Sequence, residues 1–172
     1  MAWFGIVTAG LIFCLVQRWH KSAAVPAFCW FVMTAIVLGV IDVECQRLPR
    51  VIVGGMTLGG LALLTVATFL EGRALDLGRA LVASLVVFSV YLVFALVAHG
   101  GLGFGDVTLF GAAALYLGWV GWHAVFAAFM ITAVLGGVTG LLLMIFRRAA
   151  RDDRFAYGPM IIAGSILALL LP

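Results

Sequence analysis

Long apolar runs alternate with short polar breaks along nearly the whole chain. Seven runs stand out, at about residues 2–17, 24–41, 51–70, 79–98, 107–122, 124–146 and 156–171. About 20 apolar residues in a helix cross the hydrocarbon core of a bilayer, so most runs can span it, although the first and fifth are short. The breaks are too short for the alternation of a β-barrel, and a backbone in lipid must satisfy its own hydrogen bonds. The pattern therefore predicts seven helices, with six as the main alternative.

Composition identifies lipid as the solvent of this fold. Hydrophobic residues make up 66% of the chain, charged residues only 10%, and the mean hydropathy is +1.27. A soluble domain carries about 25% charged residues, so a water-soluble fold is excluded. The first run has no basic segment before it and no small-x-small cleavage site before Arg18, so we interpret it as a span, not a signal peptide. We predict an all-α, polytopic membrane protein with a single domain over residues 1–172.

The remaining charges and the cysteines exclude several kinds of ligand. The formal net charge is +3, and four of the ten cations lie between Arg147 and Arg154. This clustering indicates an orientation in a bilayer and no binding of nucleic acid. The three cysteines form no C-x-x-C pair, which argues against a zinc site and against a disulfide framework. We expect neither a metal nor a cofactor.

Two of the seven acidic residues lie at the boundaries of apolar runs. Asp42 stands in GVIDVECQRLP and Asp106 in GGLGFGDVTLFG. A carboxylate held near hydrocarbon is costly, and its default interpretation is functional. Helix capping is the alternative. It is weak for Asp42, since a negative charge opposes the dipole at a helix C-terminus, but stronger for Asp106, which could be the N-cap of a helix beginning at Val107.

Both aspartates are expected on the same side of the membrane, because two helices intervene between them. The cations divide six to four between the two sides, and the positive-inside rule makes the aspartate side cytoplasmic. The six are Arg47, Arg50, Arg147, Arg148, Arg151 and Arg154, against Arg18, Lys21, Arg73 and Arg79 on the other side. We expect a multi-pass protein of the cell inner (cytoplasmic) membrane, in contact with lipid, with its N-terminus in the cytoplasm and its C-terminus outside.

A glycine-rich segment leads into Asp106, since residues 100–106 read GGLGFGD. Glycine reaches φ > 0 and has no side chain, so this segment is expected to bend, to be mobile, and to let another backbone approach the carboxylate. A nucleotide-binding loop is excluded, because no strand precedes the segment and no G-K-[S/T] follows it. His99 and Glu44 stand nearby. We interpret His99 as an interfacial polar residue and Glu44 as a solvated neighbour that points away from Asp42.

Three segments together resemble the type IV prepilin peptidase family, the GxGD-type aspartyl proteases of the membrane. They occur in the family's order and at comparable separations, and the resemblance runs from about residue 24 to the end. The segments are Asp42 with Leu48-Pro49, then Gly103-Phe104-Gly105-Asp106, then Tyr157-Gly158-Pro159. The chain departs from the family pattern at two positions. Thr108 stands where G-x-G-D-x-K-L has its lysine, and Arg50 replaces a small polar residue.

The resemblance implies a membrane-embedded aspartyl endopeptidase that removes the basic leader peptide from prepilin or pilin-like precursors at the cytoplasmic face. Asp42 and Asp106 would be the catalytic pair. Supporting positions around the substrate and the loop would be Gly103, Gly105, Pro49, Gly158 and Pro159. Many members carry an insert with two C-x-x-C pairs that accompanies N-methylation of the pilin. The sequence has no such pairs, so a peptidase-only form is expected.

Two other classes of function stay open at this point. A small transporter or channel would use Asp42 and Asp106 to bind protons or cations, although such sites usually lie near the membrane midplane on broken helices. A non-catalytic assembly subunit would not need either carboxylate. The sequence does not determine the particular pilin-like substrate, the oligomeric state, or which aspartate acts as the base.

Overall fold

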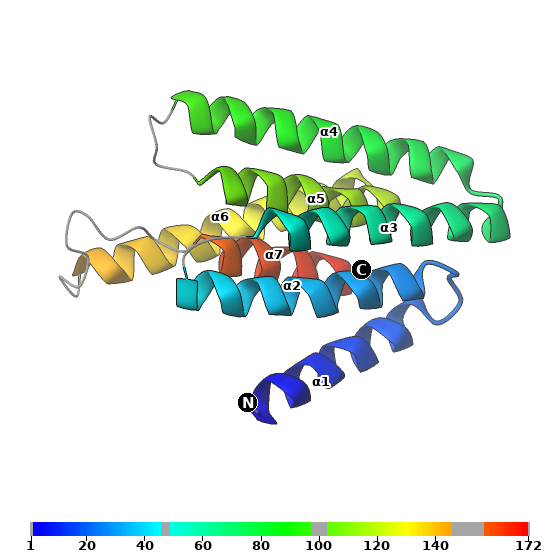
Figure 1. The fold of residues 1–172 in the computed structure, drawn as a ribbon, viewed down its shortest axis with the longest axis horizontal. Helices are drawn as coiled ribbons and strands as arrows, with labels where there is room; N and C mark the ends of the chain where they lie inside the picture. The colour runs from blue at the N-terminus through cyan, green and yellow to red at the C-terminus, as the bar shows by residue number, and fades with distance from the viewer. Residues whose placement is uncertain (1, 46–48, 98–102, 146–156, 172) are drawn as a thin grey trace.

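The computed structural model describes residues 2–45, 49–97, 103–145 and 157–171, and these segments form a helical bundle (Figure 1). The helices are α1 (Ala2–Trp19), α2 (Val25–Cys45), α3 (Arg50–Glu71), α4 (Ala74–Val97), α5 (Phe104–Val120), α6 (Trp122–Ile145) and α7 (Gly158–Leu170). The described segments contain seven helices and no strand. The predicted all-α fold is confirmed, with one helix for each apolar run.

Within the described segments, four helices are long and apolar enough to cross a membrane, judged by length and composition. They are α2, α3, α4 and the Trp122–Leu142 part of α6, whereas α5, α7 and Gly5–Trp19 are shorter apolar helices. Large apolar side chains cover the outside of the bundle, as at Phe69 and Leu75. Such a surface is stable in hydrocarbon and not in water. The protein is therefore a multi-pass membrane protein.

Helix α5 forms the core of the bundle. From Asp106 to Trp119, every residue except Thr108 is buried. A helix that is apolar on all sides is expected to be enclosed by other helices, and α4, α3, α7, α6 and α2 all contact α5. The N-terminus of α5 is therefore held at one end of the bundle by several neighbours, which fixes the position of Asp106.

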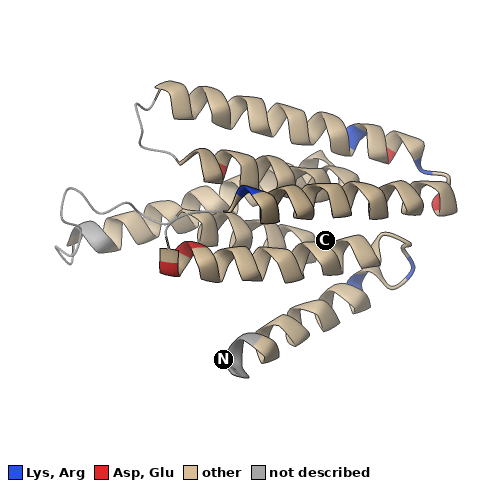
Figure 2. Cartoon of the chain, in the orientation of Figure 1, with Lys and Arg blue, Asp and Glu red and all other residues tan. Residues whose placement is uncertain are grey.

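The charged residues of the described segments lie toward the two ends of the bundle, as Figure 2 shows. At the end away from the aspartates, Asp76 pairs with Arg73 and Arg79, and Glu71 pairs with Arg73. Arg79 also donates to the carbonyl groups of Gly118 and Trp119 at the end of α5. In the sequence, Glu71 and Asp76 stand in a polar break beside arginines, which predicts solvated loop charges. This prediction is wrong, because both acids are partly buried and ion-paired. Asp152 and Asp153 lie outside the described residues.

Candidate active site

Asp42 lies in the last turn of α2 and is only 5% exposed. The backbone N–H of Gly158, at the start of α7, donates a hydrogen bond to its carboxylate. A Cβ atom on Gly158 would stand 2.5 Å from Oδ2 of Asp42, so the close approach requires glycine. The dipole of α2 disfavours a negative charge at this position, but the N-terminus of α7 lies against the same carboxylate and favours it.

Oδ2 of Asp42 is buried and has no hydrogen-bond partner within the part of the chain that the structure describes. Nearly all buried polar atoms in proteins are hydrogen-bonded, and an exception calls for a functional explanation. A carboxylate oxygen that keeps a lone pair available in an apolar environment is well suited to accept or share a proton.

Asp106 lies in the first turn of α5 and is 9% exposed. The helix begins at Phe104, three residues before the predicted start, and Gly103 is its N-cap with φ −69° and ψ 138°. The alternative in which Asp106 is the N-cap of a helix beginning at Val107 is therefore wrong. The backbone N–H of Asp106 donates to the Gly103 carbonyl at 3.0 Å, and its carboxylate accepts from the Gly103 N–H. This reciprocal pair resembles a capping box and holds the carboxylate in place.

The two carboxyl groups lie at the same end of the bundle, although α3 and α4 separate them in sequence. Figure 2 shows the acidic residues at the end of α2 and the start of α5 on the same side. The groups are close enough to interact electrostatically. Two buried like charges at short range repel strongly, since little water screens them. This environment favours a state in which the pair holds one proton.

Tyr157 lies near the aspartate pair, and a second tyrosine, Tyr91, lies near Tyr157. The ring of Tyr157 packs against Gly136 of α6, where a Cβ atom would stand 2.5 Å from the ring carbon Cε2. Burial and the nearby Asp106 carboxyl group raise the pKa of the Tyr157 phenol above its ordinary value. Tyr91 of α4 lies near Tyr157 and packs edge-on against Phe110. Tyr91 was not predicted from the sequence, where it stands as a single phenol inside an apolar run.

The structure places the other predicted positions around the same end. Pro49 is the N-cap of α3. Pro159 stands in the first turn of α7, where a backbone N–H has no partner within the helix, so proline costs no hydrogen bond there. Gly105 is a partly buried residue of the first turn of α5. Glu44 is exposed, as expected for a solvated neighbour. Leu48, Arg47, His99 and the glycines before Gly103 lie outside the described residues, so the bend and mobility of that segment stay predictions.

Gly103 is needed for its small size more than for its backbone freedom. Its φ of −69° is one that any residue adopts. A Cβ atom on Gly103 would stand 3.2 Å from Oδ2 of Asp106, which is a tight contact. The glycine therefore gives the carboxylate space, and φ > 0 is not used at this position.

The fold and this site define a polytopic helical membrane protein with a buried aspartate pair at one end of its bundle. The sequence model of the type IV leader peptidase family matches residues 29–141, more than half of the chain, and this stretch includes both aspartates. The chain belongs to the type IV leader peptidase family. The resemblance found in the motifs is thus confirmed.

Curated relatives agree with this assignment. The prepilin leader peptidase/N-methyltransferase of Bacillus subtilis is 30% identical over 166 residues, which cover 96% of this chain and 63% of that protein. The proteins of the same name from Aeromonas hydrophila and Pseudomonas aeruginosa are 25% and 27% identical, over 96% and 88% of this chain and 54% and 52% of their own length. The chain therefore spans little more than half of these relatives. No solved structure matches it. The comparisons lend no support to a transporter or channel.

Proposed function

We propose that the protein is a membrane aspartyl endopeptidase that removes the basic leader peptide from a prepilin or pilin-like precursor. Asp42 and Asp106 would be its catalytic pair. The observation that carries the proposal is that two buried carboxyl groups lie at the same end of the bundle and interact electrostatically, in a chain of the leader peptidase family. Relatives over the same region are named prepilin leader peptidases, and this name supports the choice of substrate.

The proposed chemistry follows from a carboxyl pair that shares one proton. The ionised carboxylate takes a proton from a water molecule, whose oxygen attacks the carbonyl carbon of the scissile peptide bond. The protonated partner donates its proton to the carbonyl oxygen. The tetrahedral intermediate then collapses as a proton passes to the leaving amine, and the C–N bond breaks. The titration belongs to the pair, so neither residue is assigned as the base.

The direct test uses purified protein in detergent and a candidate precursor that has a basic leader followed by an apolar helix. A product shortened at the junction of leader and helix supports the proposal. A precursor that stays intact, with every candidate from the same genome, contradicts it. An assay of proton or cation flux in proteoliposomes would reveal a transporter instead.

A groove between α1, α2 and α7 supports the proposal that the precursor helix approaches the aspartate pair from this side of the bundle. It has a volume of about 550 Å³ and an almost entirely apolar lining that includes Leu11, Val40 and Ile162. Pro159, beside the Asp42 site, and the exposed Glu44 also line it. An apolar precursor helix would lie in the groove, and its cationic leader would meet Glu44.

Replacing Glu44 with lysine is expected to raise KM for a precursor with a basic leader by about fivefold and to leave kcat almost unchanged. The reason is that an exposed charge pair contributes up to about 1 kcal/mol, which a like charge removes. Steady-state cleavage kinetics measure the change. A precursor with a neutral leader is the matched control and should show no rise in KM. A rise of the same size with both precursors would exclude leader recognition by Glu44.

We also propose that the protein lies in the inner membrane with its aspartate end facing the cytoplasm, because most cations of the sequence fall on that side. Cys45, the last residue of α2, is exposed at this end. In a variant without the other two cysteines, an impermeant maleimide is expected to label Cys45 in inverted vesicles and not in spheroplasts. Ala74→Cys, at the other end of the bundle, should give the reverse pattern. Labelling of Cys45 in spheroplasts would contradict this orientation.

A further inference from the structure

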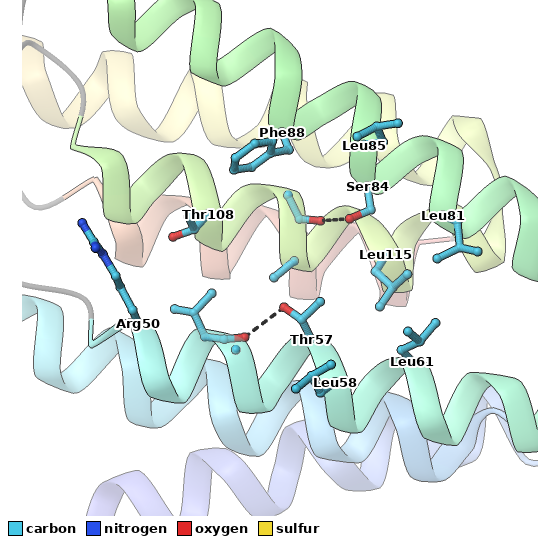
Figure 3. A pocket seen from close by; sticks show the side chains of 14 residues that line it. Arg50, Thr57, Leu58, Leu61, Leu81, Ser84, Leu85, Phe88, Thr108 and Leu115 are labelled. Atoms are coloured by element: carbon cyan, nitrogen blue, oxygen red, sulfur yellow. Dashed lines mark hydrogen bonds between the residues drawn. The ribbon is translucent and has the colours of Figure 1, made fainter.

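A second groove runs between α3 and α4, with α5 as its floor (Figure 3). α4 packs mainly against α5 and only sparsely against α3, which leaves space between the two consecutive helices. The volume of the groove is about 740 Å³. This value lies within the range of roughly 300–1,000 Å³ that is typical of ligand-binding sites. The groove therefore has room for a ligand and is open to the surroundings of the bundle.

Apart from Arg50, the described wall residues of this groove offer only apolar contact. Three hydroxyl groups line it, and each donates its hydrogen bond to a backbone carbonyl group. Thr57 donates to Val53, Ser84 to Gly111 and Thr108 to Gly105, at 2.9, 2.8 and 2.8 Å. The other wall residues are apolar apart from Arg50. The part of a ligand that lies along the groove must therefore be hydrocarbon-like.

Among the described residues that line the groove, Arg50 is the one that is charged, and it stands at the end of the groove near the aspartate site. Its guanidinium group lies over the ring of Phe104, 5.4 Å from the centroid. It forms no ion pair with any carboxylate of the described residues. Stacking occupies the face of a guanidinium group and leaves its N–H edge able to donate two hydrogen bonds to a phosphate. The groove thus combines an apolar channel with a cation at one end.

We propose that this groove binds a phospholipid with an anionic headgroup, whose phosphate lies at Arg50 and whose acyl chain lies along Leu58, Leu61 and Leu85. A lipid matches both features, because it has an apolar body and a negative charge at the level of the membrane surface. The apolar helix of the proposed precursor fits less well, since its basic leader would be repelled by Arg50. The inference concerns lipid binding and does not depend on the peptidase activity.

Native mass spectrometry of the detergent-purified protein tests whether the charge of Arg50 selects an anionic headgroup. The probes are phosphatidylglycerol and phosphatidylcholine with identical acyl chains. Wild-type protein is expected to retain phosphatidylglycerol preferentially, and Arg50→Gln should lower this preference about fivefold. Arg18→Gln is the matched control, because Arg18 is also exposed and lies 5.7 Å from the centroid of an aromatic ring, Trp19, but away from the groove. An unchanged preference in Arg50→Gln, or an equal loss in Arg18→Gln, would overturn the proposal.

The glycines of α3 allow a test of the groove itself. A Cβ atom at Gly54, which lines the groove, or at neighbouring Gly55, which does not, would meet no other atom within 4 Å. Gly54→Leu is therefore expected to fill the groove and abolish retention of both lipids, whereas Gly55→Leu should retain them. Full lipid retention by Gly54→Leu would overturn the proposal.

Two further measurements distinguish a lipid from a protein occupant of the groove and test whether a restored positive charge restores lipid selectivity. If Gly54→Leu loses a bound precursor or a second copy of the chain while keeping its lipid, the groove is a protein-binding surface and the proposal is wrong. The double variant Arg50→Gln/Thr108→Lys places a new cation at the same end of the groove, and it should regain the preference for phosphatidylglycerol. Since no readout involves cleavage, a failure here is distinct from a failure of the proposed peptidase function.

Discussion

Replacement of either Asp42 or Asp106 with asparagine is expected to abolish cleavage, with a fall in rate of at least about a thousandfold. Asparagine has nearly the same shape as aspartate, but it can neither accept the proton of the attacking water nor donate one to the carbonyl oxygen. The two buried groups repel each other when both are charged, so removal of one charge should not unfold the bundle. Single-turnover cleavage of a precursor measures the effect.

The matched control for these variants is Asp76→Asn at the opposite end of the bundle. Asp76 is also an aspartate of low exposure, but it pairs with Arg73 and Arg79 and lies far from the proposed chemistry. This variant should cleave at close to the wild-type rate. Wild-type cleavage by Asp42→Asn or Asp106→Asn, in protein that elutes as a folded species, would remove that residue from the mechanism. Equal loss in all three variants would point to a general effect on the fold.

Gly158→Ala is expected to lower kcat by about a hundredfold, with a smaller change in KM. The added Cβ atom would stand 2.5 Å from Oδ2 of Asp42 and 3.0 Å from its Cγ, so either the carboxylate or the start of α7 must move. A displacement of about 1 Å in a catalytic group can cost a factor of about 100 in rate. Cleavage kinetics on purified protein measure both constants.

Two other glycines turn this prediction into a graded series. Gly137→Ala in α6 adds a Cβ atom that meets nothing within 4 Å, and it should be neutral. Gly103→Ala adds one at 3.2 Å from Oδ2 of Asp106, a contact that a small shift relieves, and it should be intermediate. Wild-type kcat in Gly158→Ala would mean that the position of Asp42 against α7 is unimportant for catalysis. A loss of the same size in Gly137→Ala would show that any added methyl group disturbs the bundle.

The positions of the helices could be predicted because lipid leaves the backbone little choice. An apolar run must form a helix to satisfy its hydrogen bonds, and the polar breaks mark its ends. The bounds of α3 and α6 lie within two residues of the predicted runs. The predicted start of α5 was three residues too late, because the sequence Gly103-Phe104-Gly105 is typical of a loop. A glycine N-cap together with the returning carboxylate of Asp106 extends the helix through Phe104 and Gly105.

The candidate site was predictable only in part. A carboxylate at the end of an apolar run is conspicuous wherever it occurs, and the number of intervening helices places Asp42 and Asp106 at one end. The tight approach of Gly158 to Asp42 was not predictable from spacing, since more than a hundred residues separate the two positions. The position of Tyr91 beside Tyr157 and the hydrogen bond from Ser22 to Glu71 likewise depend on how the helices pack.

The sequence by itself determined which segments are helical, that the surroundings are lipid, and which two acids stand apart. The tertiary structure decided which face of each helix is turned inward, and therefore which side chains meet at the aspartate pair and which line the groove at Arg50. The physical reason is that helices in a bilayer are apolar on both their inner and outer faces. Hydrophobicity then carries almost no information on rotation about the helix axis, and close packing between small and large side chains sets it instead.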